Sequence, residues 1–154
     1  MSKIISFKGK LNIGEQDRIK LSTIKGKKGY KINKFQLIGT TPGKNAAEYI
    51  GQIFNKDQTG NITDVVDFSN TELLAVVFMN IDTNPAYVSG SNIIFDNVKT
   101  NQDIFINITD AGGNTVPCNY YIELEVMDLS DVETTMLTLQ SLRTIASQWV
   151  NNII

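Results

Sequence analysis

The chain has 154 residues, of which 42% are hydrophobic, as is typical of one globular domain with a sizeable core. It has no histidine and a single cysteine, Cys118, which excludes Ser-His-Asp and Cys-His catalysis, an internal disulfide and an ordinary zinc site. The formal net charge is only −2, but residues 1–44 carry +9 and residues 45–154 carry −11. This asymmetry predicts opposed basic and acidic surfaces, provided that folding keeps the two parts of the chain apart.

Targeting signals are not evident in the sequence. No run of about 18 apolar residues is present, so we expect no membrane-spanning segment and no membrane partner. The start, MSKIISFKGK, lacks the apolar stretch and small-residue cleavage site of a signal peptide. We therefore expect synthesis in the cytoplasm without a signal peptide. Cys118 suits a reducing compartment, as a small side chain packed in a strand.

Alternation of polar and apolar residues predicts eight or nine short β-strands over most of the chain. The first strands are expected at 3–8 and 17–23. In residues 29–39 the apolar phase changes near Asn33 and Lys34, which predicts a β-bulge. Further strands are expected at 46–54, 62–68, 72–81, 92–96, 102–109 and 119–127.

Some of these segments also predict burial and connection. Residues 72–81 form a continuous apolar run, which is typical of a strand buried on both faces. Residues 102–109 and 119–127 alternate strictly, so each should have one buried and one wetter face. KGKKG at 25–29 and DAGGN at 110–114 resemble hairpin turns. Together the strands predict an all-β fold, an antiparallel β-sandwich or barrel.

A helix is expected after this β-domain, which we place at 1–128, so that 129–154 forms a C-terminal helical segment. Ser130 is a good N-cap, and Glu133 completes a capping box. No Gly or Pro follows Pro117. An apolar stripe at helical spacing consists of Val132, Met136, Leu139, Leu142, Ala146, Trp149, Val150 and Ile153.

The helix is apolar over more of its circumference than one sheet edge would cover, because Leu137 and Ile145 lie off the stripe. The helix packs either on its own sandwich or on a neighbouring subunit. Burial of one such side chain contributes roughly 1.5–3 kcal/mol, so several could hold a neighbour in place. The predicted subunit-interface residues are Met136, Leu137, Ile145, Trp149, Val150, Ile153 and Ile154.

A second contact is predicted in the segment 25–34, which places five lysines around Tyr30. It could bind the phosphate backbone of a single-stranded nucleic acid, or meet an acidic neighbour in an assembly. It could also be a solvated lysine-rich hairpin that discourages edge pairing. The predicted charged-contact residues are Lys25, Lys27, Lys28 and Lys31.

Other motifs do not indicate a reaction, and we predict a non-enzymatic protein without cofactor or metal. GTTPGKNA at 39–46 fails as a phosphate-binding loop, because its glycine spacing is one residue short and Asn45 replaces Ser or Thr. A carbohydrate- or ligand-binding module would need exposed aromatic residues on one sheet face, for which Tyr121 and Phe105 are the candidates. A calcium site would require loop-end aspartates to converge, from among Asp64, Asp67, Asp96, Asp103 and Asp128.

The stretch IIFDNVKTNQDIFINITDAGGNTVPCNYYIELEVMDLSDVETTMLTLQSLRTI, with the earlier DRIKLSTIKGKKGYKINKFQLIG, resembles small structural proteins of marine bacteriophages. It is similar to single jelly-roll coat proteins in its low charge, its many Asn, Thr and Ile residues and its terminal arm, over roughly 15–145. The resemblance implies a jelly-roll-like sandwich of about eight strands. It also implies a virion location, as a capsid, vertex or decoration protein that binds itself and other virion proteins. The C-terminal helix departs from many coat proteins.

Overall fold

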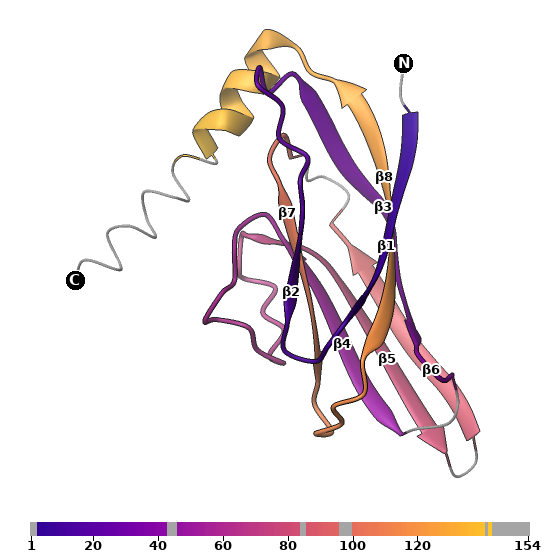
Figure 1. The fold of residues 1–154 in the computed structure, drawn as a ribbon. Coiled ribbons are helices and arrows are strands. Elements are labelled where there is room, and N and C mark those ends of the chain that lie inside the picture. The colour runs from indigo at the N-terminus through magenta and orange to yellow at the C-terminus, as the bar shows by residue number, and fades with distance from the viewer. Residues whose placement is uncertain (1–2, 43–45, 84–85, 96–99, 141, 143–154) are drawn as a thin grey trace, which may run out of the picture.

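The computed structural model describes residues 3–42, 46–83, 86–95, 100–140 and 142. Its strands are β1 (Lys3–Leu11), β2 (Gln16–Ile19), β3 (Lys28–Gly39), β4 (Ala47–Phe54), β5 (Leu73–Thr83), β6 (Ala86–Ile94), β7 (Ile104–Asp110) and β8 (Cys118–Asp128). They form a three-stranded sheet, β1-β8-β3, and a five-stranded sheet, β2-β7-β4-β5-β6. Figure 1 shows the two layers and the helix at one end of them. The predicted antiparallel β-sandwich is confirmed.

The strand order is that of a jelly roll in which one strand has changed sheets. A long antiparallel hairpin rolled onto itself pairs its first strand with its eighth, second with seventh, third with sixth and fourth with fifth. β1 pairs with β8, β2 with β7 and β4 with β5 in this way. β6 pairs with β5 instead, so in the described residues no ladder joins β3 to β6. The strand order therefore differs from that of a jelly roll in the position of β6 alone.

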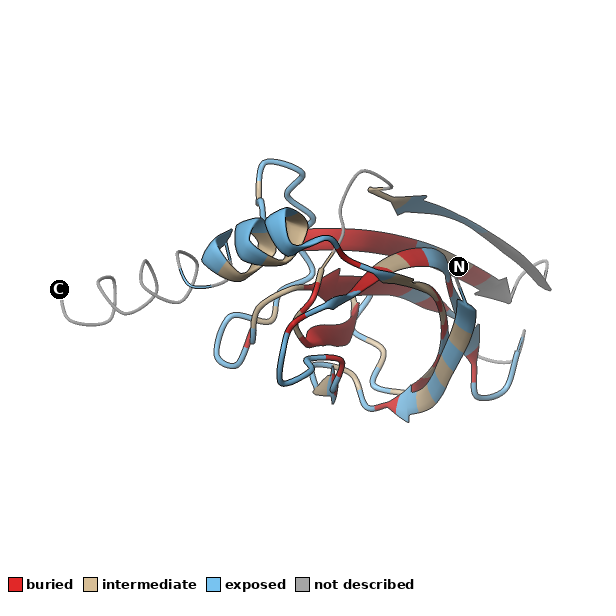
Figure 2. Ribbon diagram, turned by 90° about the horizontal axis from the view of Figure 1, so that it is seen from above, coloured by how far each residue is buried: buried red, intermediate tan, exposed pale blue. Residues whose placement is uncertain are grey.

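The core lies between the sheets because each strand turns alternate side chains inward. In β8, Ile122 and Leu124 are buried whereas Tyr121 is exposed, so the alternation predicted for 119–127 is confirmed. Figure 2 shows buried residues in the strands of both layers. The largest fully buried apolar side chains are Tyr49, Phe35, Ile53, Ile104, Ile106, Ile108, Ile122 and Leu124.

The predicted β-bulge in β3 is confirmed. The register against β8 shifts between Ile32 and Lys34. Tyr30 and Ile32 before the shift, and Phe35 and Leu37 after it, are all buried. The extra residue therefore keeps both apolar pairs in the core, although their spacing along the chain is odd.

Both predicted hairpin turns are wrong. The connection from β2 to β3 and the connection from β7 to β8 each lead from one sheet to the other. The chain does turn there, with positive φ angles of 62° at Gly26 and 83° at Gly113. Turn residues show where the chain bends, but the sheet that it enters is decided by distant pairing, here of β8 with β1 and β3.

The strand predicted at 62–68 is also wrong, because residues 55–72 contain no strand. The amide Nε2 of Gln52, on β4, donates to the backbone oxygen of Thr63 over 3.2 Å and to that of Val65 over 3.4 Å. The Gln52 side chain thus satisfies backbone carbonyl groups that would accept hydrogen bonds from a neighbouring strand if this segment were itself a strand.

The outer face of β7 is dry, in contrast to the wetter face predicted for 102–109. Phe105, Asn107 and Thr109 are all buried. In the β4–β7 ladder Asn107 lies opposite Gln52. The side chain of Gln52 is hydrogen-bonded to the segment 55–72, at the backbone oxygen of Thr63. An outer apolar cluster continues this covered region with Ile50, Phe54, Leu73, Val76 and Phe95.

The run predicted at 72–81 corresponds to β5, and burial on both faces is confirmed for residues 73–77. Phe78 is exposed, beyond the outer apolar cluster. β6 begins at Ala86, well before the predicted start at residue 92, because its pairing with β5 continues to Thr83.

β2 is shorter than the predicted strand at 17–23, since it ends at Ile19. The next backbone N–H groups leave the ladder: those of Leu21 and Ser22 donate to the carboxylate of Asp103 at 2.8 and 2.9 Å. A buried carboxylate thus ends the strand.

Candidate assembly interface

The C-terminal helix, residues 131–140 and 142 of the described chain, is held on the sandwich by polar contacts. Asn101, 1% exposed, donates from Nδ2 to the oxygen of Gly26 at 3.1 Å and to Oγ1 of Thr138 at 3.2 Å. A Cβ on Gly26 would lie 3.1 Å from that same Nδ2 and 3.6 Å from Cγ2 of Thr134. Glycine therefore leaves room for the Asn101 amide, which bridges the loop and the helix. Sequence reasoning missed Asn101, which carries no local signal of this role.

The start of the helix confirms the predicted capping box. The N–H of Glu133 donates to Oγ of Ser130 at 3.1 Å, and the N–H of Ser130 donates to Oε1 of Glu133 at 3.4 Å. Leu129, just before the cap, is buried, and its N–H donates to the oxygen of Lys27 at 2.8 Å. A Cβ on Gly29 would lie 2.5 Å from Leu129, so glycine makes room for this anchor.

The apolar stripe of the helix faces solvent in its described part. Thr134 and Thr138 occupy the docked side, and Leu137 is half-buried. Figure 2 shows the exposed residues along the helix. We call outer helix face the set Val132, Met136, Leu139 and Leu142, whose side chains are 69%, 57%, 51% and 55% exposed.

Among the predicted interface residues, Met136 belongs to the outer helix face and Leu137 lies beside the docked side. The interface itself stays a prediction. The predicted interface omits three members of the outer helix face, although the sequence places them on the same apolar stripe: Val132, Leu139 and Leu142. Ile145, Trp149, Val150, Ile153 and Ile154 lie outside the described residues.

The predicted lysine cluster is partly paired within the chain. Lys28 forms an ion pair with Asp128, and Nζ of Lys27 lies 3.5 Å from Oδ1 of Asp131. Lys25 is exposed, and Lys31 lies opposite Glu125 in the β3–β8 ladder. A charged contact through these four lysines stays a prediction.

The prediction of opposed basic and acidic surfaces is wrong for the three-stranded sheet. Its central strand, β8, comes from the acidic part of the chain and lies between β1 and β3, which come from the basic part. An ion pair of 3.8 Å between Nζ of Lys34 and Glu123 joins two of these strands. Folding thus places acidic strands beside basic strands. The two parts of the chain are not kept apart, as the prediction of opposed surfaces requires.

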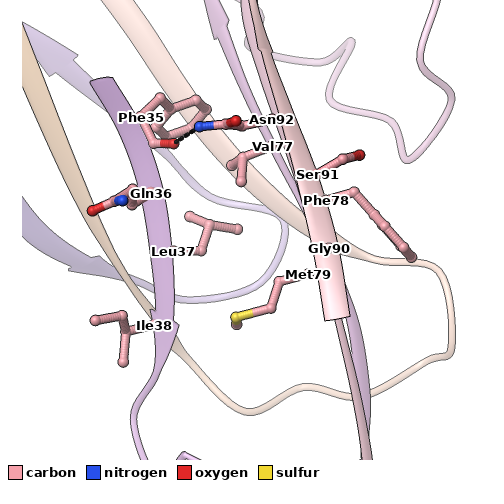
Figure 3. A pocket seen from close by; sticks show the side chains of 10 residues that line it. All are labelled: Phe35, Gln36, Leu37, Ile38, Val77, Phe78, Met79, Gly90, Ser91 and Asn92. Carbon is pink, nitrogen blue, oxygen red and sulfur yellow. Dashed lines mark hydrogen bonds between the residues drawn. The ribbon is translucent and has the colours of Figure 1, made fainter. Parts of the chain in front are cut away.

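A groove of about 370 Å³ lies where the β3–β6 ladder is missing. Figure 3 shows its lining, which is uncharged and includes Phe35 and Leu37 of β3 facing Gly90 and Asn92 of β6. Nδ2 of Asn92 donates to the backbone oxygen of Phe35 at 3.2 Å, so a side chain replaces a backbone ladder at this point. A Cβ on Gly90 would collide with the backbone of β5.

The two candidate aromatic residues do not share a sheet face. Tyr121 lies on β8 in the three-stranded sheet and is 37% exposed. Phe105 lies on β7 in the other sheet, is only 9% exposed, and has the guanidinium of Arg18 at 5.7 Å from its ring centre. The two therefore form no common binding platform.

Asp103, one of the candidate calcium ligands, is engaged by protein groups. Burial opposes its ionisation, but the N–H groups of Ser22 and Leu21 and the guanidinium of Arg18 outweigh this and lower the pKa of Asp103 to about 2. The Nε of Arg18 lies 2.7 Å from its Oδ2. The described residues hold no group of three or more His, Cys, Asp or Glu side chains placed to bind a metal.

Cys118 is fully buried, and burial, together with the nearby charge of Asp110, raises the pKa of its thiol to about 12. The thiol is therefore protonated and inert at neutral pH.

No known protein-family model matches this chain, and no curated protein sequence matches it. None of the helices in the described residues is long and apolar enough to cross a lipid bilayer.

Proposed function

We propose that the protein is a structural subunit of a virus shell, which assembles with itself and with other virion proteins. The observation that carries the proposal is the outer helix face, an apolar surface that the chain's own sandwich leaves exposed. Jelly-roll sandwiches serve as capsid subunits, but also as lectins and cupins, so the fold does not choose among these functions.

The orientation of the helix favours protein contact over solvent exposure. Amphipathic helices normally turn their apolar side to a core, whereas this helix docks through Thr134 and Thr138. Burial of each apolar side chain contributes roughly 1.5–3 kcal/mol, so a neighbour that covers the outer helix face gains substantial free energy. A rigid sandwich that presents one such helix is suited to a geometric role in a shell.

The double variant Met136→Glu/Leu139→Glu tests this contact. We expect the wild-type protein to have a mass well above 17.1 kDa by light scattering, and to keep it in about 0.5 M NaCl because the contact is apolar. We expect the double variant to be a folded monomer. The matched control is Ile24→Glu/Val65→Glu, at exposed apolar positions outside the helix, and it should assemble like the wild type.

A wild-type protein that stays at 17.1 kDa at every concentration and salt would contradict self-assembly. An assembled double variant would place the contact elsewhere.

A ligand-binding module is a second candidate function, favoured by the uncharged groove between β3 and β6. Its volume of about 370 Å³ falls within the range of roughly 300–1,000 Å³ of small-molecule sites. The candidate predicts binding of an uncharged ligand on a saccharide array. Asn92→Lys, which puts a charge at the groove, should abolish that binding, whereas Ser6→Lys on the exposed face of β1 should not.

A further inference from the structure

We propose that the groove between β3 and β6 accepts an extended segment of another polypeptide chain, which adds a strand between the two sheets. The segment is uncharged and carries small or apolar side chains at alternate positions. The contact goes beyond the proposed function, because it does not use the outer helix face. Its ligand is a polypeptide, whereas the ligand-binding candidate places a small molecule in the same groove.

Both walls of the groove are edge strands. β3 is the last strand of the three-stranded sheet and β6 is the last strand of the five-stranded sheet, so each has a ladder on one side only. Within the described residues no backbone hydrogen bond joins the two strands. An edge strand presents a row of N–H and C=O groups that can pair with another chain. The groove therefore lies between two incomplete hydrogen-bonding edges.

The direction of the free backbone groups on β3 follows from its contact with β6. In an antiparallel ladder, successive residues direct both of their backbone groups to opposite sides of the strand. The oxygen of Phe35 accepts from Nδ2 of Asn92, so the backbone groups of Phe35 point away from β8. Leu37, two residues further on, directs its N–H and C=O to the same side. No printed hydrogen bond outside the β3–β8 ladder reaches Leu37 in the described chain.

The free edge of β6 is defined in the same way. The N–H of Phe95 donates to the oxygen of Leu74 at 3.1 Å, so residues 93 and 91 also direct their backbone groups toward β5. Gly90 is in the other phase, and its backbone groups point away from β5. Leu37 and Gly90 thus present donors and acceptors from the two walls of the groove that they line.

Apolar side chains form the floor of the groove. In Figure 3, Leu37 and Met79 point into the space between the strands, whereas Gln36 and Ile38 point away from it. Leu37 and Val77 are buried, and Met79 is half-buried. Because a strand directs alternate side chains to opposite faces, one set of an added strand can pack on this floor while the other set stays at the surface.

Charged residues occur on the other sheet edges but not along the groove. The β1 edge carries three lysines, and the four-residue β2 carries Asp17 and Arg18. Such charges discourage pairing with another chain. The sequence has no charged residue in β6 or in residues 35–39 of β3. An uncharged segment is therefore the matching occupant, because a charged one would lose its hydration in the groove without gaining a partner.

An alternating threonine–valine hexapeptide, with a fluorescent label on a flexible glycine–serine linker, is the probe for this site. We expect it to bind the wild-type protein in fluorescence anisotropy. N-methylation of its alternate backbone amides keeps the side chains but removes hydrogen-bond donors. The methylated peptide should bind at least about tenfold more weakly, because two or three hydrogen bonds are lost.

Asn92→Lys, which places a charge at the groove, should abolish peptide binding at concentrations up to about 1 mM. The matched control Asn12→Lys adds the same charge at an exposed residue outside the groove, and it should bind like the wild type. Far-UV circular dichroism checks that both variants are folded.

Hydrogen exchange of the wild-type protein, followed by NMR, locates the contact without a substitution. The bound peptide should slow exchange of the N–H groups of Leu37 and Gly90 at least about tenfold. The N–H of Gln36 points toward β8 in the ladder and should change little.

Equal binding of the unmodified and methylated peptides, or unchanged exchange at Leu37 and Gly90, would overturn strand addition. Binding that Asn92→Lys leaves intact would overturn the location. A groove that binds a saccharide but not the peptide at about 1 mM would overturn the inference in favour of the small-molecule candidate. None of these results changes the light-scattering test of the outer helix face, so the inference and the proposed function fail separately.

Discussion

Asp103 joins the start of β7 to the chain that follows β2 through one buried carboxylate. It accepts hydrogen bonds from Leu21, Ser22 and Arg18. Nothing in its sequence neighbourhood distinguishes it from the exposed aspartates, because its partners lie more than eighty residues away. Its role follows from the pairing of β2 with β7, which brings Arg18 opposite Phe105.

Asp103→Asn is expected to lower the free energy of unfolding by about 2 kcal/mol at pH 7, measured by urea denaturation. The amide can still accept the backbone hydrogen bonds but loses its charge against Arg18. Asp64→Asn, at an exposed aspartate, is the control and should change stability little. Equal effects of the two substitutions would contradict the role of Asp103.

The contribution of Asp103 to the free energy of unfolding should also depend on pH. The folded pKa of Asp103, about 2, lies below the ordinary value of 3.8, so its contribution is present above pH 4 and is lost as the pH falls toward 2. In thermal melts between pH 5 and pH 2, Asp103→Asn should lose less stability than the wild type. Parallel losses would show that other carboxylates dominate.

At the scale of elements, the helix shows what local sequence determines. Ser130 and Glu133 form the capping box that their spacing predicts, because a cap needs only residues within one turn. The side that docks could not be predicted. The apolar stripe favours burial of that side of the helix. Instead, Asn101, which is far away in the sequence and hydrogen-bonded to Gly26, binds the hydroxyl of Thr138 and so docks the polar side.

Gly26→Ala tests this contact between the Gly26 loop, Asn101 and the helix, and Gly14→Ala is its matched control. Both glycines have positive φ angles, 62° and 83°, so both variants lose roughly 1 kcal/mol to backbone strain. A Cβ at residue 26 also crowds Asn101, whereas a Cβ at residue 14 meets nothing within 4 Å. We therefore expect the larger loss of unfolding free energy for Gly26→Ala, in chemical denaturation. Equal losses would show that the contact between Gly26 and Asn101 tolerates a side chain at residue 26.

At the scale of the whole molecule, the interleaving of charges bears on nucleic-acid binding. Lys27 and Lys28 already face Asp131 and Asp128, so fewer cations remain for phosphate groups. We expect a single-stranded oligonucleotide to bind with a Kd no tighter than about 100 µM at 0.15 M salt, by fluorescence anisotropy. Tight binding that Lys25→Ala/Lys31→Ala abolishes would contradict this expectation and favour the nucleic-acid hypothesis.

Local sequence patterns predict the strands with clear alternation, the β-bulge of β3 and the helix cap, because each depends on the side-chain period or on neighbours within a turn. Tertiary structure alone decided the sheet to which each strand belongs. Contacts in the folded chain also explain why residues 62–68 form no strand, since Gln52 binds a backbone oxygen there. They place an acidic strand between two basic strands, and they leave Met136 exposed to solvent. These features depend on contacts between residues far apart in the chain, whose free energies no local pattern encodes.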